Sequence, residues 1–574
     1  MAELPQIPQQ PATGNKNAGM ELRLLLAFVL MGLVLFVTPY FYKPPVGPKQ
    51  TAPVTKKQAA QVTTQSTTAA QTQAAPTSAP NPGTITAASE QPFIVDTDLY
   101  RIEFSNRGAV VKSWTLKKYL DSRGKPLELV DSAAFAKAPP PFAIVFKDGN
   151  QAQQLNTALF RATPASDGLG IDYEYASGAL HCRKSFRFVK NSYLSQLTTE
   201  VSQNGQPVPH LIEWRGGFGD QTVLNRQSVQ QAVYYDLSNS KLQVNDVSKA
   251  KNGTVTATGD YSFAGIDDKF FAAVLLPKEN TTTEVQTVRD EFPPAPDAKP
   301  EPHVGVAVGG DAVNSFSLYV GPKDVDILKR IDPRLPQLID WGKFFWFVAK
   351  PLFVCLHWLN DNLVHNYGWS IVVITIVINL ILLPLRFSSL KSARKMQALQ
   401  PQIQAINAKY KNIGLRDPKK AEQNQEVMDL YKKHGVNPMG GCLPMFVQLP
   451  ILYGFYTVLA VTIELRGAHW LWVTDLSQPE ALPIHVLPII MIVTQFFMQK
   501  MTPNPSVDPA QAKMMMLMPL MFGFFFYNMS SGLVLYWLTS NVVGIVQQWL
   551  INRSHPAPVV VAPPKVVSKK KSRG

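Results

Sequence analysis

Three polar side chains are spaced along one long apolar stretch of the sequence. Thr375 and Asn379 are four residues apart, and Arg386 follows seven residues after Asn379. In an α-helix these spacings place all three side chains on the same face. Such a stripe could hold water beside a polar chain that passes through the membrane. The alternative is that these groups form hydrogen bonds that hold neighbouring helices together.

Uncharged polar and flexible apolar residues also occur in the other apolar stretches. Gln448 and Asn541 are the further candidates for lining a polar path. Methionine and phenylalanine are frequent between residues 514 and 526, and such flexible side chains suit a surface that accepts varied apolar segments. Residues that face lipid would have a similar composition, so this run alone does not decide between the two interpretations.

The sequence contains no recognisable arrangement of catalytic or metal-binding residues. Its nine histidines include no HExxH motif, no phosphate-binding GxxxxGK[ST] motif occurs, and Cys182, Cys355 and Cys442 are far apart. Asp267 and Asp268 have no partner that the sequence identifies. We therefore predict no catalytic residue, metal, cofactor or small-molecule substrate, and we expect that the protein is not an enzyme.

Six apolar stretches predict membrane-spanning helices, because a span needs about 20 apolar residues. The predicted spans are residues 24–42, 366–386, 442–463, 481–499, 514–529 and 532–551. The last two divide a charge-free run, Met514–Asn552, that as one helix would be about twice as long as a bilayer is thick. Residues 341–360 are apolar but interrupted by charged residues and a proline, which predicts an amphipathic helix lying on the outer membrane surface.

The distribution of charge predicts the orientation of these spans. Of the net charge of +14, most lies in residues 386–433, with 11 basic and 4 acidic residues, and in residues 553–574, with 6 basic and no acidic residues. The positive-inside rule then places residues 1–23, 387–435 and 553–574 in the cytosol. This topology accounts for the basic composition without nucleic-acid binding.

The basic segment 387–435 is predicted to form a helical hairpin. Its apolar residues recur at alternating intervals of three and four, which is typical of two helices that pack along a seam. The seam residues are Met396, Leu399, Ile403, Ile406 and Tyr410. The hairpin could be a solvated structure that carries topology signals, or it could be a docking surface for a partner.

The segment between the first two spans is predicted to lie outside the cytosol. Residues 43–90 are rich in Pro, Thr, Gln and Ala and predict a disordered linker. Residues 91–330 contain short alternating runs, such as Leu99–Phe104, which predict an all-β domain, most simply a sandwich. No cleavage motif follows residues 24–42, so this first span is interpreted as a retained signal anchor.

Several motifs resemble those of the YidC family of membrane insertases. They are Val436–Pro444, Gln448–Ile451, Phe497–Pro503 and Ser531–Asn541. The resemblance implies a six-span inner-membrane protein with cytosolic termini, a periplasmic β-supersandwich and a cytosolic hairpin. It also implies an insertase and chaperone that inserts and folds inner-membrane proteins, alone or with the Sec translocon, through a hydrophilic groove open to the cytosol. By the same resemblance, Thr375, Phe525 and Trp537 line the path of the substrate.

One position departs from the family pattern. The family has an arginine five residues before the proline that ends the second span, whereas this sequence has Asn379 there, and Arg386 is the nearest cation. The implied partners are nascent and newly made inner-membrane proteins, the Sec translocon and the lipid bilayer. The basic tail at residues 569–573 is either a contact for ribosomal RNA or a topology signal. The alternative function is a transporter or channel with a sugar-binding periplasmic domain, which the charge-free spans and the lack of an internal repeat disfavour.

Overall fold

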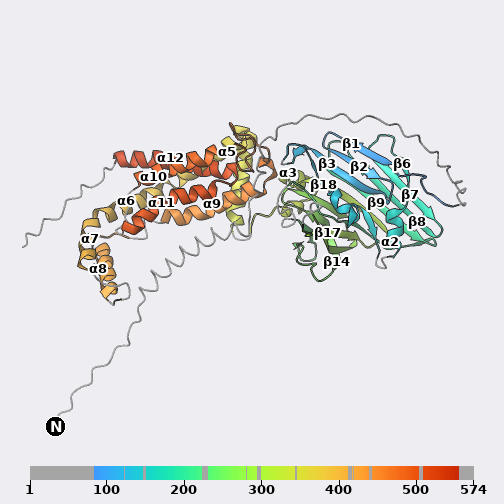
Figure 1. Ribbon diagram of the computed structural model, residues 1–574, viewed down its shortest axis with the longest axis horizontal. Helices are drawn as coiled ribbons and strands as arrows, with labels where there is room; N and C mark the ends of the chain where they lie inside the picture. Colours follow the sequence, from blue (N-terminus) through green and yellow to red (C-terminus); the bar gives the residue numbers. More distant parts are fainter. Residues whose placement is uncertain are drawn as a thin grey trace, which may run out of the picture. The chain divides into compact units, whose positions relative to one another are not determined.

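The computed structural model describes residues 83–121, 123–146, 150–222, 230–279, 281–293, 299–342, 345–410, 417, 419–437, 443–502 and 509–554. The chain divides into two compact units at residue 340 (Figure 1). We call the described residues up to 340 the β-unit and those from 341 onward the helical unit. The predicted first span, most of the linker 43–90 and most of the basic tail lie outside the described residues.

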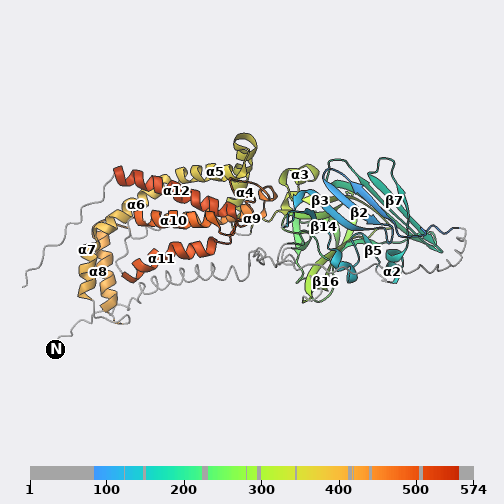
Figure 2. The ribbon, with the colours of Figure 1, turned by 45° about the horizontal axis from the view of Figure 1, so that its top comes forward.

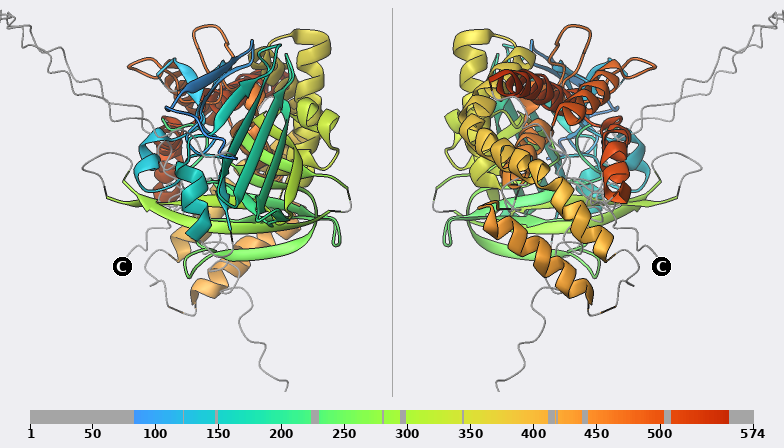
Figure 3. Two further views of the ribbon diagram at one scale, coloured as in Figure 1. Left: turned by 90° about the vertical axis from the view of Figure 1, so that its right-hand side faces the viewer. Right: turned by 90° about the vertical axis from the view of Figure 1, so that its left-hand side faces the viewer.

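The β-unit contains a four-stranded antiparallel sheet and a fourteen-stranded antiparallel sheet (Figure 3, left). The small sheet has the order β1 (Pro92–Asp96), β2 (Tyr100–Ser105), β3 (Val110–Leu120) and β4 (Pro126–Glu128). The large sheet has the order β5 (Ala143–Val145), β11 (Leu211–Trp214), β17 (Glu301–Gly309), β16 (Thr282–Phe292), β14 (Val255–Asp267), β15 (Phe271–Pro277), β18 (Val313–Pro322), β9 (Leu194–Gln203), β8 (Leu180–Phe188), β7 (Gly170–Ser177) and β6 (Arg161–Pro164). Strand β10 (Gln206–Pro207) pairs with β9, while β12 (Gln231–Asp236) joins β13 (Lys241–Asn245) to β14.

The β-unit also has short helices, and one of them was not predicted. They are a 3₁₀-helix Ser132–Ala136, α2 (Asn150–Thr157), α3 (Val325–Ile331) and a 3₁₀-helix Leu335–Leu338. Helix α2 lies within residues 91–330, which the sequence predicted as an all-β domain. This helix is a mostly polar segment of eight residues, so it has no apolar periodicity by which a sequence could reveal it.

An aromatic core joins the two sheets. Phe104 of the small sheet lies 4.9 Å from Phe186 of the large sheet, measured between ring centroids, and Trp114 lies 6.4 Å from Trp214. All four side chains are buried. Burial of each of these side chains contributes about 1.5–3 kcal/mol to the stability of the fold. The alternating apolar residues that predicted strands therefore also form the buried faces that hold the two sheets together.

Charged residues in the β-unit are buried in partnered groups. Lys323 donates hydrogen bonds to Asp267 Oδ2 and to the carbonyl oxygen of Leu338, both at 2.9 Å. Asp267 therefore has a partner that lies 56 residues away, which the sequence did not identify. Arg215 contacts both Glu213, at 3.5 Å, and Asp290. Burial raises the pKa of the Glu213 carboxyl to about 7, against the opposing effect of Arg215.

The helical unit is built from the following helices (Figure 1). They are α4 (Trp346–Leu359), a π-helical segment (Asn360–Val364), α5 (Tyr367–Ile381), α6 (Leu383–Ala398), α7 (Gln400–Lys409), α8 (Lys419–Lys433), α9 (Leu443–Val461), α10 (Val486–Met501), α11 (Pro509–Phe526) and α12 (Ser531–Ser554), with a 3₁₀ turn at Ile463–Leu465. Helix α12 packs against both α5 and α10.

Only part of the span prediction can be compared with helix lengths. Among the described residues, Ser531–Arg553 is the one helix that is long and apolar enough by itself to cross a membrane. Trp346–Val364 and Tyr367–Ile381 reach that length together but are bent by 116°. Phe446–Val461, Val486–Met501 and Leu517–Phe526 are shorter apolar helices. The count of six spans, and the position of α4 on a membrane surface, stay predictions.

Helices α7 and α8 form an antiparallel pair at one end of the helical unit (Figure 2). Of the predicted seam, Met396, Leu399 and Ile403 are buried in one apolar cluster. Val427, Leu430 and Tyr431 pack against the same cluster. Glu426 on α8 accepts hydrogen bonds from Lys409 at 2.6 Å and from the Tyr410 hydroxyl at 2.8 Å. Gln423 Nε2 on α8 also donates to Asn407 Oδ1 on α7 at 2.5 Å, so the pair is held by an apolar seam and by polar bridges.

We predict that the stability of the β-unit depends on pH through Glu213. Its pKa is raised from 4.5 to about 7 in the folded chain, so the folded state keeps a proton that the unfolded state loses. This stabilisation is complete below about pH 4.5 and is lost as the pH rises through about 7. Glu213→Gln should flatten the slope of the unfolding free energy against pH between about pH 4.5 and 7.

The measurement is hydrogen exchange in β11 and β17 of the full chain in detergent micelles, with rates corrected for the intrinsic effect of pH. Glu291→Gln is the control, because Glu291 is an exposed carboxylate on β16 and its removal should preserve the wild-type slope. An unchanged slope in Glu213→Gln would show that this carboxyl is not the titrating group.

Candidate functional site

Two stripes of polar side chains meet where α5 and α6 pack against α12. The first stripe is Thr375, Asn379 and Arg386. The second is Tyr536, Ser540 and Gln547, which repeats the same spacing of four and seven residues. On α12 this spacing keeps the three side chains on one helical face, whereas Thr375 and Asn379 lie on α5 and Arg386 lies on α6, beyond the break at Leu382. The helices therefore present two polar stripes within otherwise apolar segments.

Hydrogen bonds connect the two stripes. The Ser540 hydroxyl donates to Asn379 Oδ1 at 3.4 Å, and Gln547 Nε2 donates to the Asn379 carbonyl oxygen at 3.1 Å. Gln547 Oε1 in turn accepts from Arg386 Nη1 at 3.2 Å. The Gln547 amide thus bridges the cation of α6 and the backbone of α5, and Asn379 is only 2% exposed.

Thr375 and Asn379 also form hydrogen bonds within their own helix. The Thr375 hydroxyl donates to the carbonyl oxygen of Ile371 at 2.6 Å, and Asn379 Nδ2 donates to the carbonyl oxygen of Thr375 at 2.8 Å. Polar side chains in apolar surroundings commonly take such backbone partners. In this conformation both groups are buried and hydrogen-bonded.

Arg386 lies in a space that a glycine creates. A Cβ atom added at Gly544 would lie 3.1 Å from Arg386 Nη1 and 2.8 Å from Met498 Cε. Among the residues that the structure describes, Arg386 makes no ion pair, and its one side-chain hydrogen bond is to Gln547. A partly buried guanidinium with four unused N–H donors can donate further hydrogen bonds to an anionic or carbonyl-rich chain.

The other predicted residues surround α12 on different sides. Gln448 Nε2 donates to the Tyr536 hydroxyl. The Phe455 ring stacks on the Tyr536 ring with 4.2 Å between their centroids. Asn541 Nδ2 donates to the carbonyl oxygen of Met491 at 3.3 Å, and Trp537 Nε1 donates to Gln495 Oε1 at 3.2 Å. Gln448 therefore joins α9 to α12, whereas Asn541 and Trp537 join α10 to α12.

Phe525 belongs to an aromatic cluster next to Trp537. The Phe525 ring lies 5.6 Å from Phe526, and Phe526 lies 5.2 Å from Trp537. The adjacent Phe524 side chain is 86% exposed. The cluster places a half-buried aromatic surface beside the α10 face of α12.

The structure thus brings Thr375, Asn379 and Arg386 together against α12. Gln448 on α9 bonds Tyr536 of the α12 stripe, Trp537 and Asn541 of α12 bond α10, and Phe525 on α11 lies beside Phe526. Tyr536 and Ser540 were not chosen from the sequence. Their spacing, which matches that of Thr375, Asn379 and Arg386, was the signal that could have identified them. Whether these residues line a substrate groove stays a prediction.

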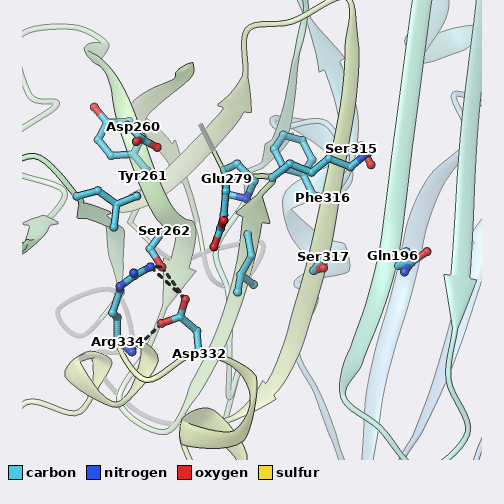
Figure 4. A pocket seen from close by; sticks show the side chains of 14 residues that line it. Gln196, Asp260, Tyr261, Ser262, Glu279, Ser315, Phe316, Ser317, Asp332 and Arg334 are labelled. Atoms are coloured by element: carbon cyan, nitrogen blue, oxygen red, sulfur yellow. Dashed lines mark hydrogen bonds and ion pairs between the residues drawn. The ribbon is translucent and has the colours of Figure 1, made fainter. Parts of the chain in front are cut away.

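The β-unit contains a polar pocket with a volume of about 460 Å³ (Figure 4). The Ser262 hydroxyl donates to Asp332 Oδ2 at 2.8 Å, and Arg334 Nη1 donates to the Ser262 oxygen at 3.1 Å. Arg334 and Asp332 also form an ion pair at 3.5 Å. These three groups at the pocket wall are engaged with one another.

Comparison with known proteins identifies both units. Residues 358–558 match the family described as 60Kd inner membrane protein, and residues 93–355 match the family described as YidC periplasmic domain. These matches define a bacterial inner-membrane protein with a periplasmic β-sandwich domain and a helical C-terminal region.

The chain belongs to the YidC family. It is 36% identical over 483 residues to the membrane protein insertase YidC of Geobacter sp. (strain M21), covering 80% of this chain and 85% of that one. The membrane protein insertase YidC of Syntrophus aciditrophicus (strain SB) is 34% identical over 563 residues, which cover 93% of this chain and 100% of the relative. A solved structure of an active YidC insertase is 21% identical and covers 81% of this chain and 93% of its own, with a TM-score of 0.36.

We predict that Arg386 and Gln547 are energetically coupled. Arg386→Leu and Gln547→Leu should each destabilise the helical unit, and the double variant should lose less than the sum of the two, because both remove the same hydrogen bond. The expected coupling is about 0.6 kcal/mol, the average for side-chain hydrogen bonds inside membranes.

The measurement is unfolding of the full chain in mixed micelles as the fraction of denaturing detergent rises. Gln548→Leu is the matched control, since Gln548 is equally buried next to Gln547 but bonds Asn552 instead. A cycle of Arg386→Leu with Gln548→Leu should be additive. Equal coupling in both cycles would contradict the bridge.

Proposed function

We propose that this protein is a membrane protein insertase and chaperone that inserts and folds inner-membrane proteins. Its relatives with that name match 80–93% of the chain. The observation that carries the proposal is the connected set Arg386–Gln547–Asn379, which places polar groups and a cation inside otherwise apolar helices. Structural helices gain little from such groups, and polar residues inside membranes commonly mark functional sites.

The proposed mechanism lowers the cost of moving a polar segment through hydrocarbon. Each unsatisfied backbone group of a translocating tail costs several kcal/mol in lipid. A hydrophilic groove open to the cytosol supplies water and side-chain partners over part of that distance. The apolar span of the substrate then partitions into lipid, which drives insertion without nucleotide hydrolysis, and no covalent bond is made or broken.

The hydrogen bonds between α5, α6 and α12 are weak enough for this groove to open. Three such bonds connect the stripes, and each contributes about 0.6 kcal/mol inside a membrane. Their total of about 2 kcal/mol allows an open state with a population of a few per cent. Water or a substrate tail would replace these partners as the helices separate.

In this proposal Arg386 supplies the cation that the family pattern places at Asn379. Two turns of helix separate the two positions, but long helical side chains point back toward the N-terminus of their helix. Arg386 accordingly reaches the Gln547 amide that also bonds the Asn379 carbonyl. The cation therefore acts on the same part of the groove as an arginine at position 379 would.

The proposal includes the topology predicted from the sequence. Six helices cross the membrane at the predicted positions, α4 lies on the periplasmic surface, and residues 387–435 form a cytosolic hairpin. The N-terminus and the basic tail are cytosolic, and residues 43–90 tether the β-unit in the periplasm. Nascent inner-membrane proteins are the substrates, and the Sec translocon and the ribosome are the partners.

The transporter alternative is not favoured. The relatives that match most of the chain are named insertases. In the β-unit, the charged groups Asp332 and Arg334 at the pocket wall pair with each other and with Ser262. Neither observation calls for a sugar or an ion as the substrate.

The test is photo-crosslinking of the full chain to a ribosome-stalled, single-span nascent protein. The crosslinker is placed at Asn379 or at Phe525, with Trp358 as the control because that side chain is exposed on α4. An adduct at Asn379 is expected only when the nascent chain is long enough to reach the bilayer. An adduct at Phe525 alone would remove Asn379 from the groove, and no adduct at either position would overturn the insertase proposal.

We predict that Asn379→Leu combined with Arg386→Leu slows insertion by roughly tenfold, since losing one charge-assisted hydrogen bond of about 1.5 kcal/mol has that effect on a rate. The control is Cys182→Ala, because Cys182 is buried in β8 of the β-unit and its removal leaves the groove polar. Activity is measured by rescue of insertion after depletion of the native protein. Equal activity of both variants would contradict the groove assignment.

A further inference from the structure

The loop between α9 and α10 covers the end of the helical unit at which three helices begin. We call residues 464–485 the α9–α10 loop. The first backbone N–H groups of α12 donate to it, from Ser531 to the Gln478 carbonyl at 2.8 Å and from Gly532 to the Leu476 carbonyl at 2.9 Å. These N–H groups have no partner within their own helix, so the loop supplies acceptors that α12 needs.

The same loop covers the start of α5. Asn366, the N-cap residue of α5, donates through Nδ2 to the His469 carbonyl at 3.0 Å. The Trp470 side chain is buried directly against Gly368, where an added Cβ would lie 2.3 Å from Trp470 Cδ1. A glycine at position 368 is therefore required for the indole to close over this helix end.

A single buried carboxylate holds the loop to the third helix. Glu480 is 5% exposed, and its Oε1 accepts from Trp472 Nε1 at 2.7 Å while its Oε2 accepts from the backbone N–H of Leu487 at 2.8 Å. The N-cap residue of α10, His485, makes no capping hydrogen bond with its side chain. Glu480 therefore provides the cap of α10 from a position five residues earlier in the chain.

The charge of Glu480 is explained by these two partners and by the helix dipole. A buried carboxylate is costly unless it is fully hydrogen-bonded or paired. Among the described residues Glu480 forms no ion pair, but it lies at the N-terminus of α10, where the aligned peptide dipoles favour a negative charge. Opening the loop would break two charge-assisted hydrogen bonds at once.

We propose that Glu480 is a positioning residue that latches the α9–α10 loop over the ends of α5, α10 and α12, so that the polar stripes are sealed at this end. Thr375 and Ser540 lie seven and nine residues beyond Gly368 and Ser531, which is about 10–14 Å of helix. The seal would keep the substrate groove open on one side only, and this role rests on the proposed insertase function. The existence of the seal does not depend on that function.

Substitutions at Glu480 and Trp472 should weaken the latch to different degrees, because they remove different hydrogen-bonding groups. Glutamine offers one acceptor oxygen, and its NH₂ group would face the other N–H donor, so Glu480→Gln should keep one bond at most. Glu480→Asp keeps the charge on a shorter side chain, and Trp472→Phe removes the indole donor alone. A residue that only fills space would tolerate glutamine, which has nearly the same volume.

The test is access of a membrane-impermeant maleimide to Ser540→Cys in the full chain, with Cys182, Cys355 and Cys442 replaced by alanine. The reagent is added to intact membranes on the side from which Leu471→Cys reacts, because Leu471 is 64% exposed on the loop. This choice makes the test independent of the proposed topology. Labelling at Leu471→Cys should be the same in every Glu480 variant and serves as the control.

Labelling of Ser540→Cys should be slow with Glu480 and at least about tenfold faster with Glu480→Ala, since one charge-assisted hydrogen bond changes an opening equilibrium by about that factor. Glu480→Gln should lie between these two, and Glu480→Asp should restore most of the protection. Unchanged labelling in Glu480→Ala would overturn the latch. If that variant does not accumulate, unchanged labelling in both Glu480→Gln and Trp472→Phe would overturn it equally.

Nascent-chain crosslinking at Phe525 is measured in the same membranes. If crosslinking is absent while the labelling pattern is as expected, the insertase proposal fails and the latch stands. If crosslinking occurs and the labelling of Ser540→Cys does not depend on Glu480, the insertase proposal stands and the latch fails.

Discussion

The arrangement of the helical unit depends on the need of polar groups in apolar surroundings for hydrogen-bond partners. Helix α12 carries Tyr536, Ser540, Asn541 and Gln547, and each of these side chains has a partner on α5, α6, α9 or α10. Helices in lipid gain no hydrophobic energy by associating with one another. Close packing and these few polar contacts therefore determine which faces of the helices meet, and they make α12 the centre of the unit.

The polar stripes and the α9–α10 loop are held by interactions of different strength. Along the stripes, Ser540 and Gln547 bond the uncharged Asn379 at 3.4 and 3.1 Å, and Arg386 adds one charge-assisted bond to Gln547 at 3.2 Å. At the α9–α10 loop, a buried carboxylate bonds an indole and a helix N-terminus at 2.7 and 2.8 Å. Charge-assisted bonds are roughly twice as strong as neutral ones. In the proposed mechanism the helices separate along the stripes while the loop end stays closed.

The two units bury polar groups in different ways. In the β-unit, buried charges lie in local groups with an opposite charge, such as Lys323 with Asp267 and Arg215 between Glu213 and Asp290. In the helical unit, the partly buried Arg386 has an amide as its side-chain partner. A cation with unused donors can still bind a further chain, whereas a saturated ion pair cannot. In the proposed function, this difference is the reason to place the substrate path in the helical unit.

The sequence by itself determined the elements and the composition of the site. Period-two runs such as Leu99–Phe104 predicted strands, and the spacing of Met396, Leu399 and Ile403 predicted a packed helical seam. The spacing of Thr375 and Asn379 likewise placed them on one face of α5, because both patterns are properties of neighbouring residues, whereas Arg386 lies on α6 beyond the break at Leu382. Tertiary structure alone decided the partners. Gln547 lies 161 residues from its partner Arg386. Glu480 caps α10, because the N-cap residue of that helix, His485, makes no capping hydrogen bond with its side chain. Lys323 neutralises an aspartate 56 residues away. Such pairings are fixed by the packing of whole elements, so no local spacing encodes them.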